Sequence, residues 1–447
     1  MNEIQPVPLG VDQLEACVRD VLAQAAKAGA SATEAVVSAD TGLSVNVRMG
    51  EVETLEYHKD RGVGVTVYFG QRKGSASTTD LRPAALREAV EAACRIARYT
   101  AEDPYAGLAD AALMAGDYPD LDLDHPWNLE AEAAIDLARR CEDVARGHDA
   151  RITNSEGAGV STFRGTVVYG NSHGFVGGYT GTRHSLSCSV VGSQDGNMQR
   201  DYWYSVSRFP EGLESAEQVG RTAAERTVQR LGARRLKTCQ APVLFVADIA
   251  RSVIGHFVGA VRGPALYRKA SFLLDHLGQS VFPSFVRIHE EPHLPRALGS
   301  APFDGEGVAT HARDLVTGGV LQGYVLDSYA GRKLGLPTTG NAGGVRNLII
   351  EPGAQDLAGL LETMGRGLLV TELIGHGINM VTGDYSRGAA GFWVENGEIQ
   401  YPVEEITIAG NLKEMFLGLQ AVGNDVDTRG NVRTGSLLID RMTIAGE

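Results

Sequence analysis

The sequence has few cysteines, and none is placed where a metal site or a disulfide framework would need it. There are 5 in 447 residues, no two form a Cys-x-x-Cys pair, and the last is Cys239. An odd and scattered set is typical of reduced thiols, so we expect a cytoplasmic protein. The chain beyond Cys239 has no thiolate to offer a metal ion.

Long apolar runs and basic blocks are also missing. No run approaches the roughly 18 apolar residues of a membrane helix, so we expect no membrane span. Met1 to Pro6 lack the charged and apolar stretches of a secretory signal. Lys and Arg number 41 against 55 Asp and Glu, a net charge of −14. That balance argues against binding to a nucleic-acid backbone.

The chain has enough apolar residues to form more than one hydrophobic core. It is 43% apolar and 21% charged, with 55 glycines and no low-complexity tract. We therefore expect a multi-domain α+β protein. Residues 100–128 contain three prolines and six aspartates and predict an exposed connector. We place a small N-terminal α/β domain at 10–103, a middle α+β domain at 126–233 and a β-rich carboxy-terminal domain at 240–446.

The spacing of apolar residues predicts the elements of each domain. Helical spacing indicates helices at 11–28, 83–97, 129–146, 213–231 and 356–365, another over 412–419, and one that Asp248 would cap. Alternating or short apolar runs indicate strands at 43–49, 63–69, 162–169, 181–191, 241–246 and 437–444.

One pentapeptide, His289-Glu-Glu-Pro-His293, matches the letters of the His-Glu-x-x-His zinc motif. That motif works on a helix, which brings two imidazoles four residues apart onto one face. Pro292 lies inside the pentapeptide, and a proline inside a helix costs about 3 kcal/mol. We therefore expect a loop here. An autonomous zinc peptidase using His289, Glu290 and His293, or His256, remains the alternative hypothesis.

A glycine-rich segment, Thr382-Gly-Asp-Tyr-Ser-Arg-Gly-Ala-Ala-Gly-Phe-Trp-Val-Glu-Asn-Gly-Glu-Ile399, is the most informative part of the chain. Asn396-Gly397 predicts a two-residue turn between antiparallel strands. The segment resembles the carboxy-terminal signature of the PmbA/TldE family, the partner subunits of the TldD metalloproteases. Segments at 63–79, 169–174, 323–329, 351–353 and 408–412 resemble that family in the same order.

The resemblance implies a TldD/PmbA-like fold and a zinc site that this chain does not complete. TldD subunits bind zinc through His-Glu-x-x-x-His on a helix and a cysteine in the signature loop. An ungapped correspondence places Gly255, His256 and Ala260 at the helix positions, and 388–390 of the loop are Gly-Ala-Ala. We therefore expect no catalytic residue, no metal ligand and no cofactor in this chain, and zinc in a TldD-like partner.

By the resemblance, the chain is half of a cytoplasmic metalloprotease, a hydrolase that degrades or matures unfolded peptides. The assembly expected is a heterodimer with a TldD-like subunit, or a homodimer, enclosing a cavity where peptides bind as added β-strands. The candidate peptide-binding residues are Asp384, Arg387 and Trp393 of the signature. Asp384 and Arg387 either orient a peptide or pair with each other.

Two further questions stay open on the sequence alone. The chain could instead be a peptide-binding or regulatory module with no role in proteolysis. The family has carried the label of a gyrase modulator, but the acidic charge does not support contact with DNA.

His256, without an acidic neighbour in sequence, is expected to pack against small residues or an interface. His376 is expected to be a turn residue.

Overall fold

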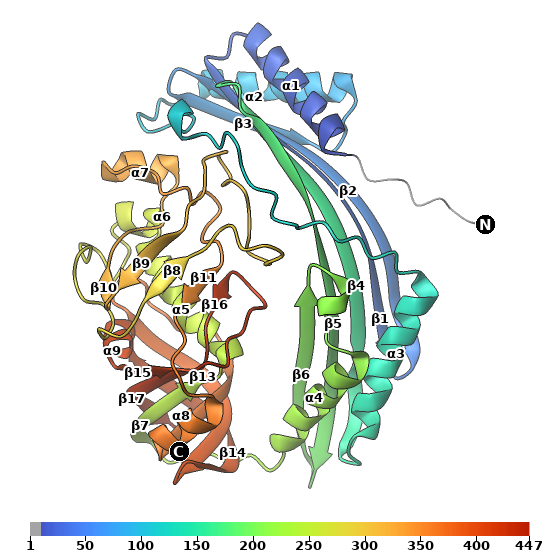
Figure 1. Ribbon diagram of the computed structural model, residues 1–447, viewed down its shortest axis with the longest axis vertical. Helices are drawn as coiled ribbons and strands as arrows, with labels where there is room; N and C mark the ends of the chain where they lie inside the picture. Colours follow the sequence, from blue (N-terminus) through green and yellow to red (C-terminus); the bar gives the residue numbers. More distant parts are fainter. Residues whose placement is uncertain (1–9, 447) are drawn as a thin grey trace.

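A long, curved antiparallel sheet forms one half of the molecule (Figure 1). The computed structural model describes residues 10–446, and in it the sheet has the strand order β3-β2-β1-β4-β5-β6. The strands are β1 (Ala32–Arg48), β2 (Glu51–Phe69), β3 (Arg72–Thr78), β4 (Ile152–Asn171), β5 (Val176–Gln194) and β6 (Asn197–Ser207).

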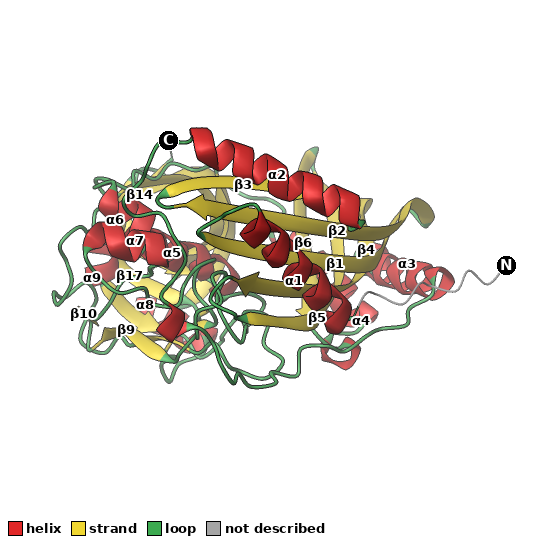
Figure 2. Ribbon diagram, turned by 90° about the horizontal axis from the view of Figure 1, so that it is seen from above, coloured by secondary structure: helices red, strands yellow, loops and turns green. Residues whose placement is uncertain are grey.

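Two pairs of helices cover the same face of this sheet. α1 (Val11–Lys27) and α2 (Pro83–Tyr99) lie over one end of the strands, and α3 (Ala131–Gly147) and α4 (Ala216–Gln229) over the other (Figures 1 and 2). Val37 of β1 belongs to the first hydrophobic cluster and Val45 to the second. Because side chains alternate along a strand, these two odd-numbered residues point to one face. The regions we expected as N-terminal and middle domains therefore share one continuous sheet.

The connector between those regions is not the exposed segment that its composition predicts. It contains a short 3-10 helix (η1, Ala111–Leu113), and its Leu121 and Leu123 are buried. Arg332 of the carboxy-terminal half holds it, donating hydrogen bonds to the carbonyl oxygens of Tyr105 and Leu108 at 2.6 and 2.7 Å. Prolines and aspartates exclude long helices and strands there, but they do not prevent packing.

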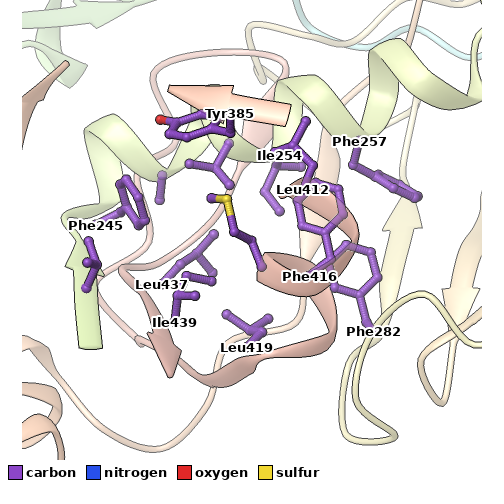
Figure 3. Close-up of a cluster of buried hydrophobic side chains, with 14 of the residues drawn as sticks. Phe245, Ile254, Phe257, Phe282, Tyr385, Leu412, Phe416, Leu419, Leu437 and Ile439 are labelled. Carbon is purple, nitrogen blue, oxygen red and sulfur yellow. The ribbon is translucent and has the colours of Figure 1, made fainter. Parts of the chain in front are cut away.

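The carboxy-terminal half is built on a six-stranded sheet with the order β14-β13-β12-β7-β17-β15. Helix α8 packs on one face of it, and α5 and α9 on the other, where the largest hydrophobic cluster lies (Figure 3). The elements are β7 (Cys239–Phe245), α5 (Ala247–Val261), α8 (Leu357–Met364), β12 (Gly367–Ile374), β13 (Asp384–Glu395), β14 (Glu398–Asn411), α9 (Leu412–Leu417), β15 (Leu419–Val422) and β17 (Leu437–Ala445).

A smaller five-stranded sheet, β10-β9-β8-β11-β16, completes this half. Its strands and the remaining helices are α6 (Gly263–Tyr267), β8 (Ile288–Glu290), β9 (Arg313–Thr317), β10 (Val320–Leu321), α7 (Ser328–Leu334), β11 (Leu348–Ile350) and β16 (Val432–Arg433), with a 3-10 turn η2 (Pro210–Gly212) in the first half. Within residues 10–446 no helix is long and apolar enough to cross a membrane.

The signature segment forms the hairpin that its turn residues predict. β13 and β14 pair up to Glu395 and Glu398, and Asn396 and Gly397 between them have φ of 55° and 78°. Two consecutive positive φ angles are what a hairpin turn of this type requires. The expected cap at Asp248 is wrong, because α5 begins one residue earlier, at Ala247, and Asp248 lies in its first turn.

Candidate functional site

The histidine-rich pentapeptide is not a helix, as its proline predicts. Ile288–Glu290 form strand β8, and the rest is loop. Glu290 is only 2% exposed, and its carboxylate accepts hydrogen bonds from Arg313 Nε (3.0 Å), Asn341 Nδ2 (2.8 Å) and the Arg346 amide (2.6 Å). His293 is held by Thr310 Oγ1 at 2.9 Å. Glu290 is thus a structural anchor whose acceptors are already engaged.

The positions that correspond to the zinc ligands do not converge either. Gly255 is exposed, whereas Ala260 is fully buried in the core cluster. Five residues along a helix turn the direction of a side chain by about 140°, so the two positions face different surroundings. Within the described part of the chain, no three His, Cys, Asp or Glu side chains are grouped so that they could hold a metal ion. The residues present here do not fit a zinc ion.

A cavity of about 480 Å³ lies between the long sheet and the carboxy-terminal half, and we call it the cleft. Small and aromatic side chains of the sheet line one side, including Ser187, Ser189 and Tyr202, while Ile249 of α5 and Leu373 of β12 line the other. A set of ion pairs joins the two sides: Arg226 to Asp201 (3.4 Å) and Asp248 (3.7 Å), and Arg230 to Asp201 (3.5 Å) and Glu372.

The cleft contains an open strand edge. β7 runs beside β12 only as far as Phe245, which pairs with Val370, and the chain then turns into α5. On that side, none of the strands in residues 10–446 pairs with 371–374, although β13 pairs with 372–374 on the other side. Thr371, Glu372 and Leu373 line the cleft. An unpaired edge offers main-chain donors and acceptors to an extended peptide.

Beside this edge three polar side chains meet, His256 of α5 with Tyr385 and Arg387 of β13, which we call the polar cluster. The rings of His256 and Tyr385 are edge-on, with centroids 6.0 Å apart. His256 Nε2, the Tyr385 hydroxyl and Arg387 Nε are buried atoms without a hydrogen-bond partner in the described residues. Tyr385 itself is 1% exposed and lies across α5 at the margin of the core (Figure 3).

The surroundings of the polar cluster disfavour added positive charge. Burial lowers the pKa of His256, and the nearby Arg387 guanidinium lowers that pKa further, so the imidazole is neutral at pH 7. Burial raises the pKa of Tyr385 to about 12, with Arg387 acting in the opposite sense. At neutral pH the cluster therefore has one positive charge, on Arg387, and a phenol that can donate a hydrogen bond.

Of the three signature residues expected to contact a peptide, only Arg387 lies in this cluster. Asp384 is exposed and accepts hydrogen bonds from Thr382 Oγ1 (2.6 Å) and Asn411 Nδ2 (3.3 Å). Strand alternation points Asp384 and Arg387 to opposite faces, so the alternative that they pair with each other is wrong. Trp393 is 4% exposed in the core, with its Nε1 donating to Glu395 Oε1 at 3.0 Å.

Sequence reasoning missed Tyr385. The sequence predicted a glycine-rich loop here that leads into a strand at 391–394, and this is wrong, because β13 already begins at Asp384. On that strand residues 385 and 387 share parity and therefore share a face. The meeting of this face with His256 depends on tertiary packing between segments far apart in the chain. His376 is exposed in a turn, as expected, and its Nδ1 contacts the Gly375 carbonyl oxygen at 2.8 Å.

Comparison with protein families gives three consecutive matches along the chain. Residues 33–97 match the PmbA/TldA metallopeptidase domain 1, residues 124–231 the central domain and residues 238–446 the C-terminal domain of the same family. The chain is 51% identical to Metalloprotease PmbA of Escherichia coli O157:H7 over 414 residues, covering 93% of this chain and 92% of that protein.

Two solved structures share the fold over almost the whole chain. A protein of Bacteroides thetaiotaomicron, described as a candidate modulator of DNA gyrase, superimposes with a TM-score of 0.93 at 29% identity, covering 98% of this chain and 99% of its own. TldE from Thermococcus kodakarensis has a TM-score of 0.83 at 20% identity, with 96% and 100% covered. The second likeness concerns the fold alone.

Proposed function

Because this chain belongs to the PmbA/TldD metallopeptidase family, we propose that it is the zinc-free subunit of a cytoplasmic metalloprotease acting on unfolded peptides. A TldD-like chain supplies the zinc, and the two form a heterodimer. The observation that carries the proposal is the outward Gly255 and the buried Ala260 at the helix positions of the metal site, together with the small residues 388–390 of the signature segment, which lie in β13. None of these can bind zinc.

The cleft suits a role in holding peptide rather than cutting it. Its open edge at 371–374 would accept an extended peptide as an added strand, with affinity from main-chain hydrogen bonds. Gly159, Ser187 and Ser189 opposite this edge leave room for varied side chains. Such recognition asks little of peptide sequence, which suits a peptidase of broad specificity.

Reconstitution tests this proposal. Peptide cleavage is measured for this chain alone, for a TldD-like chain alone and for an equimolar mixture, with an unfolded polypeptide as substrate. Cleavage by the mixture only is expected. Full-rate cleavage by the TldD-like chain without its partner would contradict the subunit role, and so would cleavage by this chain alone.

The alternative of an autonomous zinc peptidase is less well supported. Glu290, the general base that it requires, is buried and accepts hydrogen bonds from Arg313, Asn341 and the Arg346 amide. A cytoplasmic location is favoured by the cysteines, all 5 of which are free thiols.

A further inference from the structure

The polar cluster has more hydrogen-bond donors than acceptors. Arg387 has only donors, the phenol of Tyr385 can donate, and the neutral imidazole of His256 can donate from Nε2 in one of its tautomers. Buried polar atoms without a partner are costly, and the exceptions in a native fold call for an explanation. Three such atoms occur here on two adjoining elements, α5 and β13.

The charge on Arg387 is not compensated locally. In the part of the chain that the structure describes, Arg387 takes part in no ion pair, and Asp384 of the same strand points away from it. The four acidic groups that line the neighbouring cleft are already in ion pairs: Glu156 with Arg200, Asp201 and Asp248 with Arg226, and Glu372 with Arg230. An uncompensated guanidinium beside a phenol donor is suited to bind an anion with two oxygens.

The cluster adjoins the cleft, although none of its three residues lines it. Gly255, next to His256, is exposed, and no atom lies within 4 Å of where its Cβ would be. Leu373, which lines the cleft, pairs with Ala389, two residues from Arg387 on β13. The open edge of β12 ends at Ile374, whose partner Gly388 is adjacent to Arg387. A strand added along 371–374 therefore has one of its ends level with the polar cluster.

We propose that His256, Tyr385 and Arg387 bind the carboxy-terminal carboxylate of a peptide lying in the cleft. The inference rests on the proposed function for its peptide ligand and deepens it, since it assigns this subunit the recognition of peptide ends. A terminal carboxylate fits better than an acidic side chain because it arrives at the end of an extended chain, where the open edge also ends.

Binding to the full-length chain alone tests the site, without any cleavage. The probes are one uncharged, N-acetylated hexapeptide with a free carboxylate and the same peptide with a carboxy-terminal amide, titrated by calorimetry. Amidation is expected to weaken binding about 10- to 100-fold, the effect of losing hydrogen bonds to a charged group. Arg387→Gln should reduce affinity for the acid to that for the amide and leave the amide unchanged.

Two further variants keep the test interpretable if Arg387→Gln fails to fold. Tyr385→Phe retains the packed ring, and it should lower affinity for the acid only. Arg366→Gln removes an exposed arginine that precedes β12 and should change neither affinity. Equal binding of acid and amide would overturn the proposal.

Other outcomes separate this inference from the subunit role. If Arg387→Gln weakens association with a TldD-like chain while acid and amide bind alike, the carboxylate belongs to the partner and the peptide-end proposal is wrong. A chain that prefers the acid but leaves cleavage by a TldD-like chain unchanged supports the carboxylate site and contradicts the subunit role. A chain required for cleavage that does not distinguish acid from amide contradicts only the carboxylate site.

Discussion

The imidazole of His256 stands edge-on to the ring of Tyr385, with the two centroids 6.0 Å apart at an interplanar angle of 67°. This contact joins α5 to β13, the helix and the strand from which, by the resemblance to TldD subunits, a zinc site would be built. Here the same two elements meet through an aromatic contact and unpaired donors. The fold of the family is thus compatible with a site of different chemistry at this position.

Tyr385→Phe should leave the free energy of unfolding unchanged or raise it by up to about 1 kcal/mol, because the hydroxyl that it removes is buried without a partner. Urea denaturation measures the change. Tyr169→Phe is the matched control: that hydroxyl donates to Glu34 Oε2 at 3.1 Å, and its removal should cost about 1–2 kcal/mol. Equal losses in the two variants would show that the Tyr385 hydroxyl has a structural partner.

Glu290→Gln should lower the free energy of unfolding by about 3 kcal/mol, because it leaves the guanidinium of Arg313 without its carboxylate in a mostly buried site. Thermal denaturation of the isolated chain measures this loss. Glu291→Gln is the control, since within residues 10–446 its side chain forms no hydrogen bond or ion pair. An unchanged melting temperature in Glu290→Gln, with loss of a peptidase activity, would instead favour the autonomous enzyme.

Because of Asp427, part of the free energy of unfolding should depend on pH in the acid range. Burial acts to raise the pKa of Asp427, but hydrogen bonds from the Arg429 side chain and amide outweigh it, so the pKa in the folded state is lowered. The stabilisation is therefore present above the pKa of about 4 of an unfolded aspartate and is lost as pH falls below that value.

The measurement for Asp427 is the difference in unfolding free energy between the natural chain and Asp427→Asn. We expect this difference to be constant from pH 7 to about 5 and to shrink below about pH 4. Arg429, which Asp427 binds at 3.0 Å, stacks 4.2 Å from the Trp203 ring of β6, so the loss also loosens the contact between the two halves. A difference that grows on acidification would contradict this assignment.

Gly391→Ala should destabilise the signature hairpin by about 2 kcal/mol or more, because a Cβ at this position would overlap the Leu369 carbonyl of the adjoining strand. Gly255→Ala provides the contrast. That glycine lies on α5 with open space around it, and alanine there should add up to about 1 kcal/mol of stability. Denaturant unfolding of both variants gives the comparison, and a tolerated Gly391→Ala would show that β12 and β13 pair less closely than described.

Local patterns were sufficient for most helices, for the hairpin at Asn396-Gly397 and for rejecting a helix at Pro292, because each depends on neighbouring residues. The short helices α6 and α7 were not predicted. The continuous sheet was not predictable in the same way. β1 spans Ala32–Arg48, but its apolar alternation gives way to Asp40, Thr41 and Gly42 in the middle, where neither helix pair covers it. The polar cluster depends on packing between α5 and β13, which no local pattern encodes.

Zinc content tests the central claim most directly. The chain is purified alone, without tag or chelator, and zinc per chain is measured by elemental mass spectrometry. We expect no stoichiometric zinc, because residues 255, 260 and 388–390 offer no ligands. About one zinc per chain, lost in a histidine variant such as His256→Ala or His289→Ala, would contradict the zinc-free subunit and make this chain a metal-binding protein by itself.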